Sequence, residues 1–132
     1  MILVDSSVLI DYLRDKPTPQ ANRLDLLFGS PDLAIGDLVM AEVLQGYDTD
    51  REFNQALRLL NTLPVVQISD ETIAIQAARN YRTLRALGIT VRKTIDTLIA
   101  TRCITDGHAL LYSDKDFDPF VAHLGLASAM AE

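Results

Sequence analysis

Four short apolar runs, separated by helical segments, constrain the fold of this chain most strongly. The runs cover residues 1–4, 33–35, 65–68 and 109–113. Each has the length of a strand, and the segments between them carry helix start and stop signals. Strands that alternate with helices form a parallel sheet with helices packed on its faces. The sequence therefore predicts an α/β fold, an α/β/α sandwich around a central parallel sheet.

The predicted helices span residues 7–14, 20–28, 37–45, 52–60, 70–87 and 94–105. We expect Ser69 to cap the longest of these helices, and Gly88 to follow its last turn. The helix pair within 37–60 is predicted to project as a hairpin. The final ASAMAE segment, 127–132, is predicted to be a loose tail. Because no repeat or linker divides the sequence, we expect one domain over 1–132.

The net charge of −6 argues against a protein that coats nucleic acid through a basic surface. An enzyme that acts on nucleic acid is still compatible with this charge, since bound cations reverse the sign of an acidic site. No apolar run has the length of a membrane span, and the first residues lack the basic stretch, apolar segment and small-residue cleavage site of a secretory signal. The lone Cys103 forms no internal disulfide. These features predict a cytoplasmic protein without membrane contact.

Acidic residues follow two of the predicted strands. Asp5 comes directly after the first strand, and Asp114 is the first acid after the fourth. The carboxyl ends of parallel strands meet at the edge where α/β proteins bind ligands, so these two side chains are predicted to lie close together. Structural roles compete with a chemical one among these acids. Asp5 could cap the next helix, and a loop is the competing interpretation for Asp118, which follows Asp114 and Asp116 in an Asp-rich cluster.

Two further acids lie on predicted helices. Glu42 shares a helix face with Leu38 and Val39, where a carboxylate loses hydration and needs a partner or a metal. An exposed position on the polar edge of that helix is the competing interpretation. Asp96 lies in the first turn of the helix over 94–105, where the helix dipole alone would favour an acid.

Together, these four acids predict a metal site. Carboxylates gathered in one crevice repel one another unless they are protonated or neutralised by a cation. Oxygen ligands without His or Cys select Mg²⁺ or Mn²⁺, and a site of this type serves hydrolysis of phosphodiesters. His108 and His123 have no ligand-like spacing, so we expect them to be structural or surface residues.

Two other functions also explain an acid at the end of the first strand. A haloacid-dehalogenase-type phosphatase needs a second Asp two residues later, but this chain has Ser7 at that position. A receiver-like module that binds Mg²⁺ without catalysis explains the acids at the strand ends, but it does not explain Glu42 in an apolar helix.

Four segments in this order and spacing resemble the PIN-domain family, and more closely its VapC-type toxins. The segments are VDSSVLIDYL, AEVLQG, TIDTLIA and SDKDFDPF, and the resemblance runs from residue 1 to about residue 125. It implies a metal-dependent ribonuclease with a parallel sheet between helices. It also implies a homodimer, and a cognate antitoxin that blocks the site.

The resemblance assigns specific roles to acidic residues of this chain. Asp5, Glu42, Asp96 and Asp114 correspond to the family's acidic quartet, and Asp116 to its usual additional acid. Asp5, Asp96, Asp114 and Asp116 are the metal ligands that it implies. Ser7 matches a small polar residue near the first acid. Tyr112 and Ser113 stand where the family often carries Thr, so no role is assigned to either.

An acidic protein that cleaves RNA needs some positive charge near its site. Arg92 and Lys93 come directly before the helix that carries Asp96, which makes them candidates for contacts with RNA phosphates. Pairing with nearby acids on the surface is the alternative role.

Overall fold

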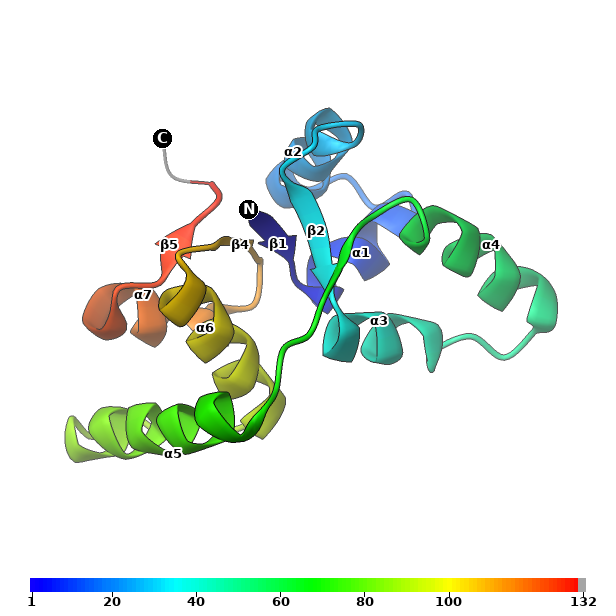
Figure 1. Ribbon diagram of the computed structural model, residues 1–132. Helices are drawn as coiled ribbons and strands as arrows, with labels where there is room; N and C mark the ends of the chain where they lie inside the picture. Colours follow the sequence, from blue (N-terminus) through cyan, green and yellow to red (C-terminus); the bar gives the residue numbers. More distant parts are fainter. Residues whose placement is uncertain (131–132) are drawn as a thin grey trace.

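The computed structural model describes residues 1–130 and has a parallel sheet at its centre (Figure 1). The strands are β1 (Ile2–Val4), β2 (Leu33–Gly36), β3 (Val65–Val66), β4 (Ala109–Leu111) and β5 (Ala127–Ser128). Their order across the sheet is β3-β2-β1-β4-β5, and every neighbouring pair is parallel. The predicted parallel sheet is therefore confirmed, with β1 at its centre.

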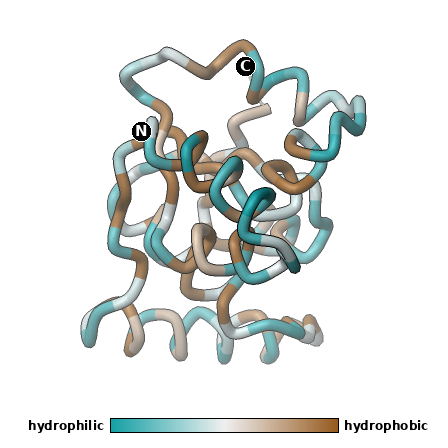
Figure 2. Tube along the Cα trace, turned by 90° about the vertical axis from the view of Figure 1, so that its right-hand side faces the viewer, coloured by the Kyte–Doolittle hydropathy of each residue, from teal (hydrophilic) through white to brown (hydrophobic). Residues whose placement is uncertain are grey.

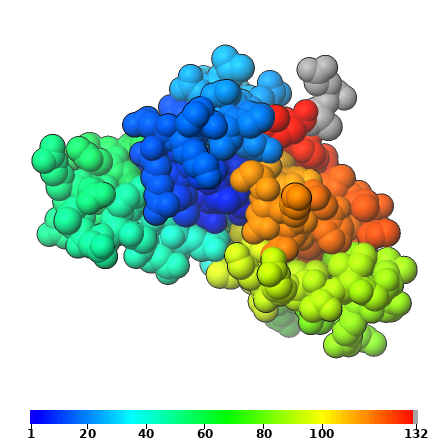
Figure 3. All heavy atoms as spheres, turned by 180° about the vertical axis from the view of Figure 1, so that it is seen from behind, coloured from blue at the N-terminus to red at the C-terminus, as the bar shows by residue number. Residues whose placement is uncertain are grey.

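Helices connect the strands and flank the sheet. They are α1 (Ser6–Leu13), α2 (Pro19–Leu27), α3 (Asp37–Leu44), α4 (Asp50–Leu60), α5 (Glu71–Ala86), α6 (Thr94–Asp106) and α7 (Asp118–Leu124), with a 3₁₀ turn, η1 (Lys115–Phe117). Seen from behind, the blue residues of α1 and α2 cover the middle of the molecule (Figure 3). In the front view, α6 lies beside β4, and α5 runs along the bottom of the molecule against α6 (Figure 1). This arrangement confirms the predicted α/β/α sandwich.

The core lies between the sheet and the helices. Leu3 and Val4 of β1 and Leu110 and Leu111 of β4 are at most 1% exposed. Apolar segments run through the interior of the trace, whereas hydrophilic segments predominate on its outer turns (Figure 2). Burial of these strands on both faces explains why they are apolar throughout. It also means that the chain leaves the core at the ends of β1 and β4, where the acids follow.

The helix pair α3 and α4 extends beyond the sheet, as predicted (Figure 1). Gly36 ends β2 and precedes α3 directly, in extended conformation. The Oδ1 atom of Asp37 accepts hydrogen bonds from the N–H groups of Leu38 (2.8 Å) and Ile68 (3.0 Å). This carboxylate therefore ties the start of α3, the helix that carries Glu42, to the chain that follows β3.

The predicted loose tail is wrong for residues 127–130. Ala127 and Ser128 form β5, which pairs in parallel with β4. The N–H of Ala129 donates a hydrogen bond to the carbonyl of Leu110, and the side chain of Ala129 is buried. The neighbouring strand supplies the partners for this short segment, and no local sequence signal announces such a strand. Residues 131 and 132 of the predicted tail lie outside the described part of the chain.

Two local predictions also need correction. The cap of α5 is Asp70 and not Ser69, because the Asp70 Oδ1 atom accepts the N–H of Ile73 at 2.8 Å. Asp118, for which a loop is the competing interpretation, instead begins α7 with Pro119, and this helix buries Phe120. Proline is well tolerated in the first turn of a helix, where its missing N–H has no partner to lose.

Among residues 1–130, no helix combines the length and the apolar character of a membrane span.

Candidate active site

The acids that follow β1 and β4 meet at one edge of the sheet. Val4 pairs with Leu111 at the ends of these neighbouring strands, and the N–H of Asp5 donates a hydrogen bond of 2.8 Å to the carbonyl of Leu111. Asp114 lies three residues beyond Leu111, where it caps η1. The register of the sheet thus brings Asp5 and Asp114 to the same carboxyl edge, as the sequence predicts.

Three carboxylates converge at this edge. One oxygen each from Asp96, Asp114 and Asp116 lies within 4.8 Å of the other two. Asp96 comes from the first turn of α6, Asp114 from the chain after β4, and Asp116 from η1. The Asp114 Oδ1 atom accepts the N–H of Asp116 at 2.9 Å, which holds the last two acids in one turn.

Asp96 is the most deeply buried of these three acids. The residue is 4% exposed, and its Oδ2 atom is buried without a hydrogen-bond partner among the described residues. Burial raises the pKa of Asp96 to about 7, and the negative charges of Asp5, Asp114 and Glu42 add to this effect, while Lys93 opposes it. A buried carboxylate without a partner costs free energy, and a bound cation would remove that cost.

Asp5 has the capping role that the sequence left open, and it has this role at the edge of the sheet that carries the other acids. It caps α1, and its Oδ2 atom accepts the N–H of Ser7 at 3.4 Å and the hydroxyl of Ser7 at 2.7 Å. Ser113 donates in turn to the Ser7 hydroxyl at 3.2 Å. Burial raises the pKa of Asp5, the hydrogen bonds from Ser7 and Ser6 lower it, and the charge of Asp114 raises it. Asp5 is nevertheless outside the group of three whose oxygens converge.

Glu42 approaches the same edge from α3. It is half-buried, so it does not occupy the exposed edge of the helix, and its Oε1 atom is buried without a hydrogen-bond partner among residues 1–130. Burial raises the pKa of Glu42, and so does the charge of Asp5, while Lys93 and the Ser6 hydroxyl lower it. Glu42 is outside the converging group, but its charge interacts with the charges of that group.

The donor set suits a hard divalent cation. The converging atoms are all carboxylate oxygens, the ligands that Mg²⁺ and Mn²⁺ prefer, and the group includes a buried oxygen that lacks a partner. The predicted metal ligands Asp96, Asp114 and Asp116 are thus brought together, with Asp5 held beside them by Ser7. Both histidines lie elsewhere: His108 is near the N-terminal amine and Asp106, and His123 is exposed on α7.

Sequence reasoning left one residue of this network without a role. Ser113 links the end of β4 to Ser7, and so to Asp5, through hydroxyl hydrogen bonds. Its position directly before Asp114 was the only available signal. Tyr112, the other residue considered there, points to a different partner, because its hydroxyl donates to Asp118 at 2.9 Å.

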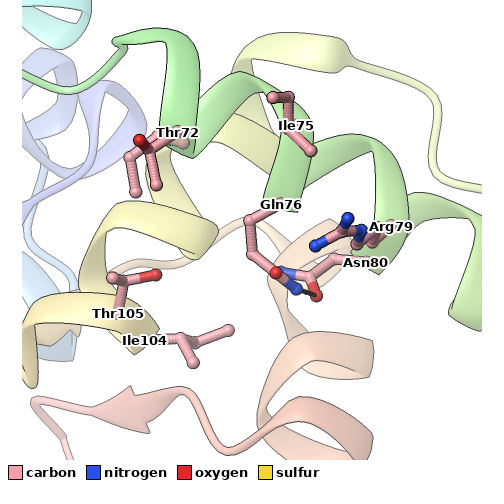
Figure 4. A pocket seen from close by; sticks show the side chains of 8 residues that line it. Thr72, Ile75, Gln76, Arg79, Asn80, Ile104 and Thr105 are labelled. Carbon is pink, nitrogen blue, oxygen red and sulfur yellow. Dashed lines mark hydrogen bonds between the residues drawn. The ribbon is translucent and has the colours of Figure 1, made fainter.

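A hollow of about 450 Å³ lies between α5 and α6, away from the acids (Figure 4). Its lining includes Thr72, Gln76, Arg79, Asn80 and Thr105. Gln76 donates to the Asn80 side chain at 3.0 Å, and Asn80 donates to the hydroxyl of Thr101 at 3.0 Å. Gln76, Asn80 and Thr101 thus hydrogen-bond to one another between the two helices. Unlike the buried Oδ2 atom of Asp96, these groups need no ligand to complete their hydrogen bonds.

The sequence matches the family described as PIN domain over residues 2–120. The chain belongs to the PIN-domain family. All five predicted site acids of this PIN domain lie within the matched range. The chain is also 31% identical, over 131 residues, to Ribonuclease VapC11 of Mycobacterium tuberculosis, with 98% of each chain covered.

Solved structures share the fold of this PIN domain. A structure of VapBC-1 from nontypeable Haemophilus influenzae matches with a TM-score of 0.74 at 19% identity, covering 97% of this chain and 96% of the other. A toxin–antitoxin complex from Klebsiella pneumoniae matches with a TM-score of 0.70 at 19% identity, covering 97% of both chains.

Proposed function

We propose that this PIN domain is a metal-dependent endoribonuclease and the toxin of a type II toxin–antitoxin pair. The observation that carries the proposal is the convergence of Asp96, Asp114 and Asp116, with a buried Asp96 oxygen that lacks a partner. The relatives named as VapC ribonucleases support the reaction and the kind of substrate. Membership of the PIN-domain family weighs against the phosphatase and receiver-like alternatives.

Asp5, Asp96, Asp114 and Asp116 are the residues that we propose to hold Mg²⁺ or Mn²⁺. When bound, the ion would activate a water molecule and stabilise the charge that develops on the phosphodiester. The hydroxyl of Ser7 holds the Asp5 carboxylate in one orientation, and the turn between Asp114 and Asp116 fixes those two acids relative to each other.

Glu42 completes the proposed catalytic quartet with Asp5, Asp96 and Asp114. Its Oε1 atom is free of hydrogen bonds within the described chain, and burial together with the charge of Asp5 raises the pKa of Glu42 above that of an ordinary Glu. A carboxylate of this kind accepts a proton efficiently near neutral pH. We therefore assign to Glu42 Oε1 the acceptance of a proton from the attacking water.

The partners that we propose are RNA, a cognate antitoxin protein and a second copy of the chain. The likeness to a structure named as a toxin–antitoxin complex supports the antitoxin. We propose that residues 1–132 act as one domain, in the cytoplasm. Co-purification of the chain with the product of an adjacent small reading frame would test the antitoxin, and recovery of the chain alone from the co-expressed pair would contradict it.

Cleavage of RNA by the purified protein tests the enzymatic part. We expect cleavage in Mg²⁺ or Mn²⁺, and none in a chelator. Asp96→Asn and Asp5→Asn should abolish cleavage while the circular dichroism spectrum stays native. The matched control is Asp32→Asn, which removes an exposed acid outside the site and should cleave like the wild type. Full activity of Asp96→Asn, free of wild-type protein, would overturn the assignment.

A further inference from the structure

Two positively charged side chains lie against the acidic site, and both belong to the segment that precedes α6. The Nη2 atom of Arg92 donates to both carboxylate oxygens of Asp116, at 3.1 Å and 3.3 Å. The Lys93 Nζ atom lies 3.9 Å from the Asp114 Oδ2 atom. Pairing with nearby acids, the alternative role for these residues, is thus what the structure contains, and both partners belong to the converging group of three.

The pair between Arg92 and Asp116 lies at the solvent-facing rim of the site. The Arg92 side chain is 75% exposed and the Asp116 side chain is 20% exposed. An exposed ion pair contributes little net stability, because water and side-chain entropy offset the attraction. The contact can therefore be exchanged for another anion at little cost.

Most of the Arg92 guanidinium is free for a second partner. A guanidinium carries five N–H donors, and here only Nη2 makes a hydrogen bond to the described residues. The Nε and Nη1 atoms make no hydrogen bond to the described residues, and the side chain is mostly in water. Each edge of a guanidinium that offers two parallel N–H groups includes Nη2, so Arg92 can bind two oxygens of a phosphate in this way once Nη2 leaves Asp116, a geometry that a lysine ammonium does not offer.

The position of Arg92 makes a metal and the guanidinium compete for Asp116. The oxygens of Asp116 contact Arg92, and one oxygen of the same side chain belongs to the group that converges with Asp96 and Asp114. A divalent cation bound by that group would be coordinated by the same carboxylate and would repel the guanidinium. Metal binding would therefore weaken the ion pair and leave Arg92 at the rim without its counter-ion.

We propose that Arg92 exchanges between two anions, Asp116 in the metal-free site and a backbone phosphate of RNA in the metal-loaded site. The inference rests on the proposed ribonuclease function and adds a coupling to it. Because metal releases Arg92, metal strengthens RNA binding through this side chain, and by linkage RNA strengthens metal binding. Arg92 is a positioning residue in this scheme, since it places the phosphate backbone beside the acids.

The test compares wild type, Arg92→Ala and the matched control Arg23→Ala, which removes an exposed arginine of α2 for which the structure contains no ion pair within residues 1–130. Calorimetry measures Mn²⁺ affinity without RNA. Fluorescence anisotropy measures the affinity for a mixed-sequence RNA 20-mer, in Mn²⁺ and in EDTA. All anisotropy samples carry Glu42→Gln, which keeps the three converging acids and is expected to prevent cleavage.

The proposal predicts changes of opposite sign. Arg92→Ala should bind Mn²⁺ about threefold or more tightly, because a competing positive charge is lost. In Mn²⁺, it should bind RNA about fivefold more weakly than wild type, with a shallower dependence of the affinity on salt. In EDTA, its RNA affinity should lie within about twofold of that of wild type, because Arg92 of the metal-free wild type is paired with Asp116 and does not contact RNA. Arg23→Ala should stay within about twofold of wild type in every measurement.

Three results would overturn the proposal. Unchanged Mn²⁺ affinity in Arg92→Ala would show that the arginine does not compete for Asp116. Equal loss of RNA affinity in Mn²⁺ and in EDTA would show an ordinary phosphate contact without exchange. Weaker binding of both ligands would show a structural role. Failure of the ribonuclease function is a separate outcome, seen as the absence of RNA cleavage by wild type without the Glu42 substitution.

Discussion

The hydroxyl of Ser7 donates a hydrogen bond of 2.7 Å to the carboxylate of Asp5, and the hydroxyl of Ser113 donates to Ser7 from 3.2 Å. This chain of hydroxyls joins the residues that follow β1 to those that follow β4. Asp5 is only 3% exposed, so these donors replace the water that burial removes from its carboxylate. Loss of either hydroxyl should therefore leave the Asp5 carboxylate less firmly oriented in the acidic site.

Ser7→Ala removes the hydroxyl hydrogen bond to Asp5 and leaves the backbone N–H groups of residues 6 and 7 as its donors. We expect a loss of about 1 kcal/mol in the free energy of unfolding, the usual size for one such bond. RNA cleavage should also fall, because the proposed ligand Asp5 is less well oriented. Chemical denaturation and cleavage assays measure the two effects. Ser113→Ala should cause smaller losses of both, and an equal or larger effect of Ser113→Ala would contradict this order.

The stability of the metal-free protein should depend on pH through Asp96. Its pKa in the folded protein is raised from 3.8 to about 7. Between these values the unfolded chain releases the proton while the folded chain keeps it, so stability is greatest below the lower value and falls as pH rises toward the upper one. The raised pKa values of Asp5 and Glu42 act in the same direction. Thermal melts in EDTA across this range should show the decline.

Asp96→Asn isolates the contribution of that residue. An amide cannot ionise, so the variant should lose part of the decline and melt at a higher temperature than wild type at pH 7 in EDTA. Added Mn²⁺ should stabilise wild type more than the variant, because ligand binding to the folded state raises stability by mass action. A variant that melts lower than wild type at pH 7 would indicate that Asp96 mainly stabilises the start of α6.

Gly36→Ala should destabilise the junction between β2 and α3. A Cβ atom at this position would lie 2.7 Å from two side-chain carbons of Ile68, which is completely buried and has little room to move. We expect a loss of about 1–3 kcal/mol by overpacking. The matched control is Gly46→Ala, where the new Cβ atom would meet the carbonyl oxygen of Val43 at an ordinary 3.5 Å. Urea denaturation of both variants decides the prediction, and equal stability of the two would contradict it.

Arg102 should be a structural residue and not part of the acidic site. From α6 it donates to the carbonyl of Ile68 at 3.0 Å, to Asp70 at 2.7 Å and to Asp106 at 3.1 Å. Arg102→Leu should therefore lower the melting temperature by loosening the start of α5 from α6. Its Mn²⁺ affinity in calorimetry should match that of wild type. A selective loss of Mn²⁺ affinity with an unchanged melting temperature would refute this assignment.

The sequence by itself determined the fold class and the edge of the sheet that carries the acids. Short apolar runs and helix signals are local properties, and a parallel sheet is the arrangement that buries such strands on both faces. Once the strands are parallel, the acids that follow the first and fourth strands must leave the core at the same edge. For this reason the shared location of Asp5 and Asp114 was predictable from their places in the chain.

Only the tertiary structure decided which groups touch. The convergence of Asp96 with Asp114 and Asp116 depends on how closely α6 packs beside β4, and α6 contributes two small residues, Ala100 and Cys103, to the buried core. The pairing of Arg92 with Asp116 joins residues that are 24 positions apart. The strand β5 exists because β4 offers it unpaired backbone groups. Such contacts arise from long-range packing, which leaves no periodic signal in the residues that make them.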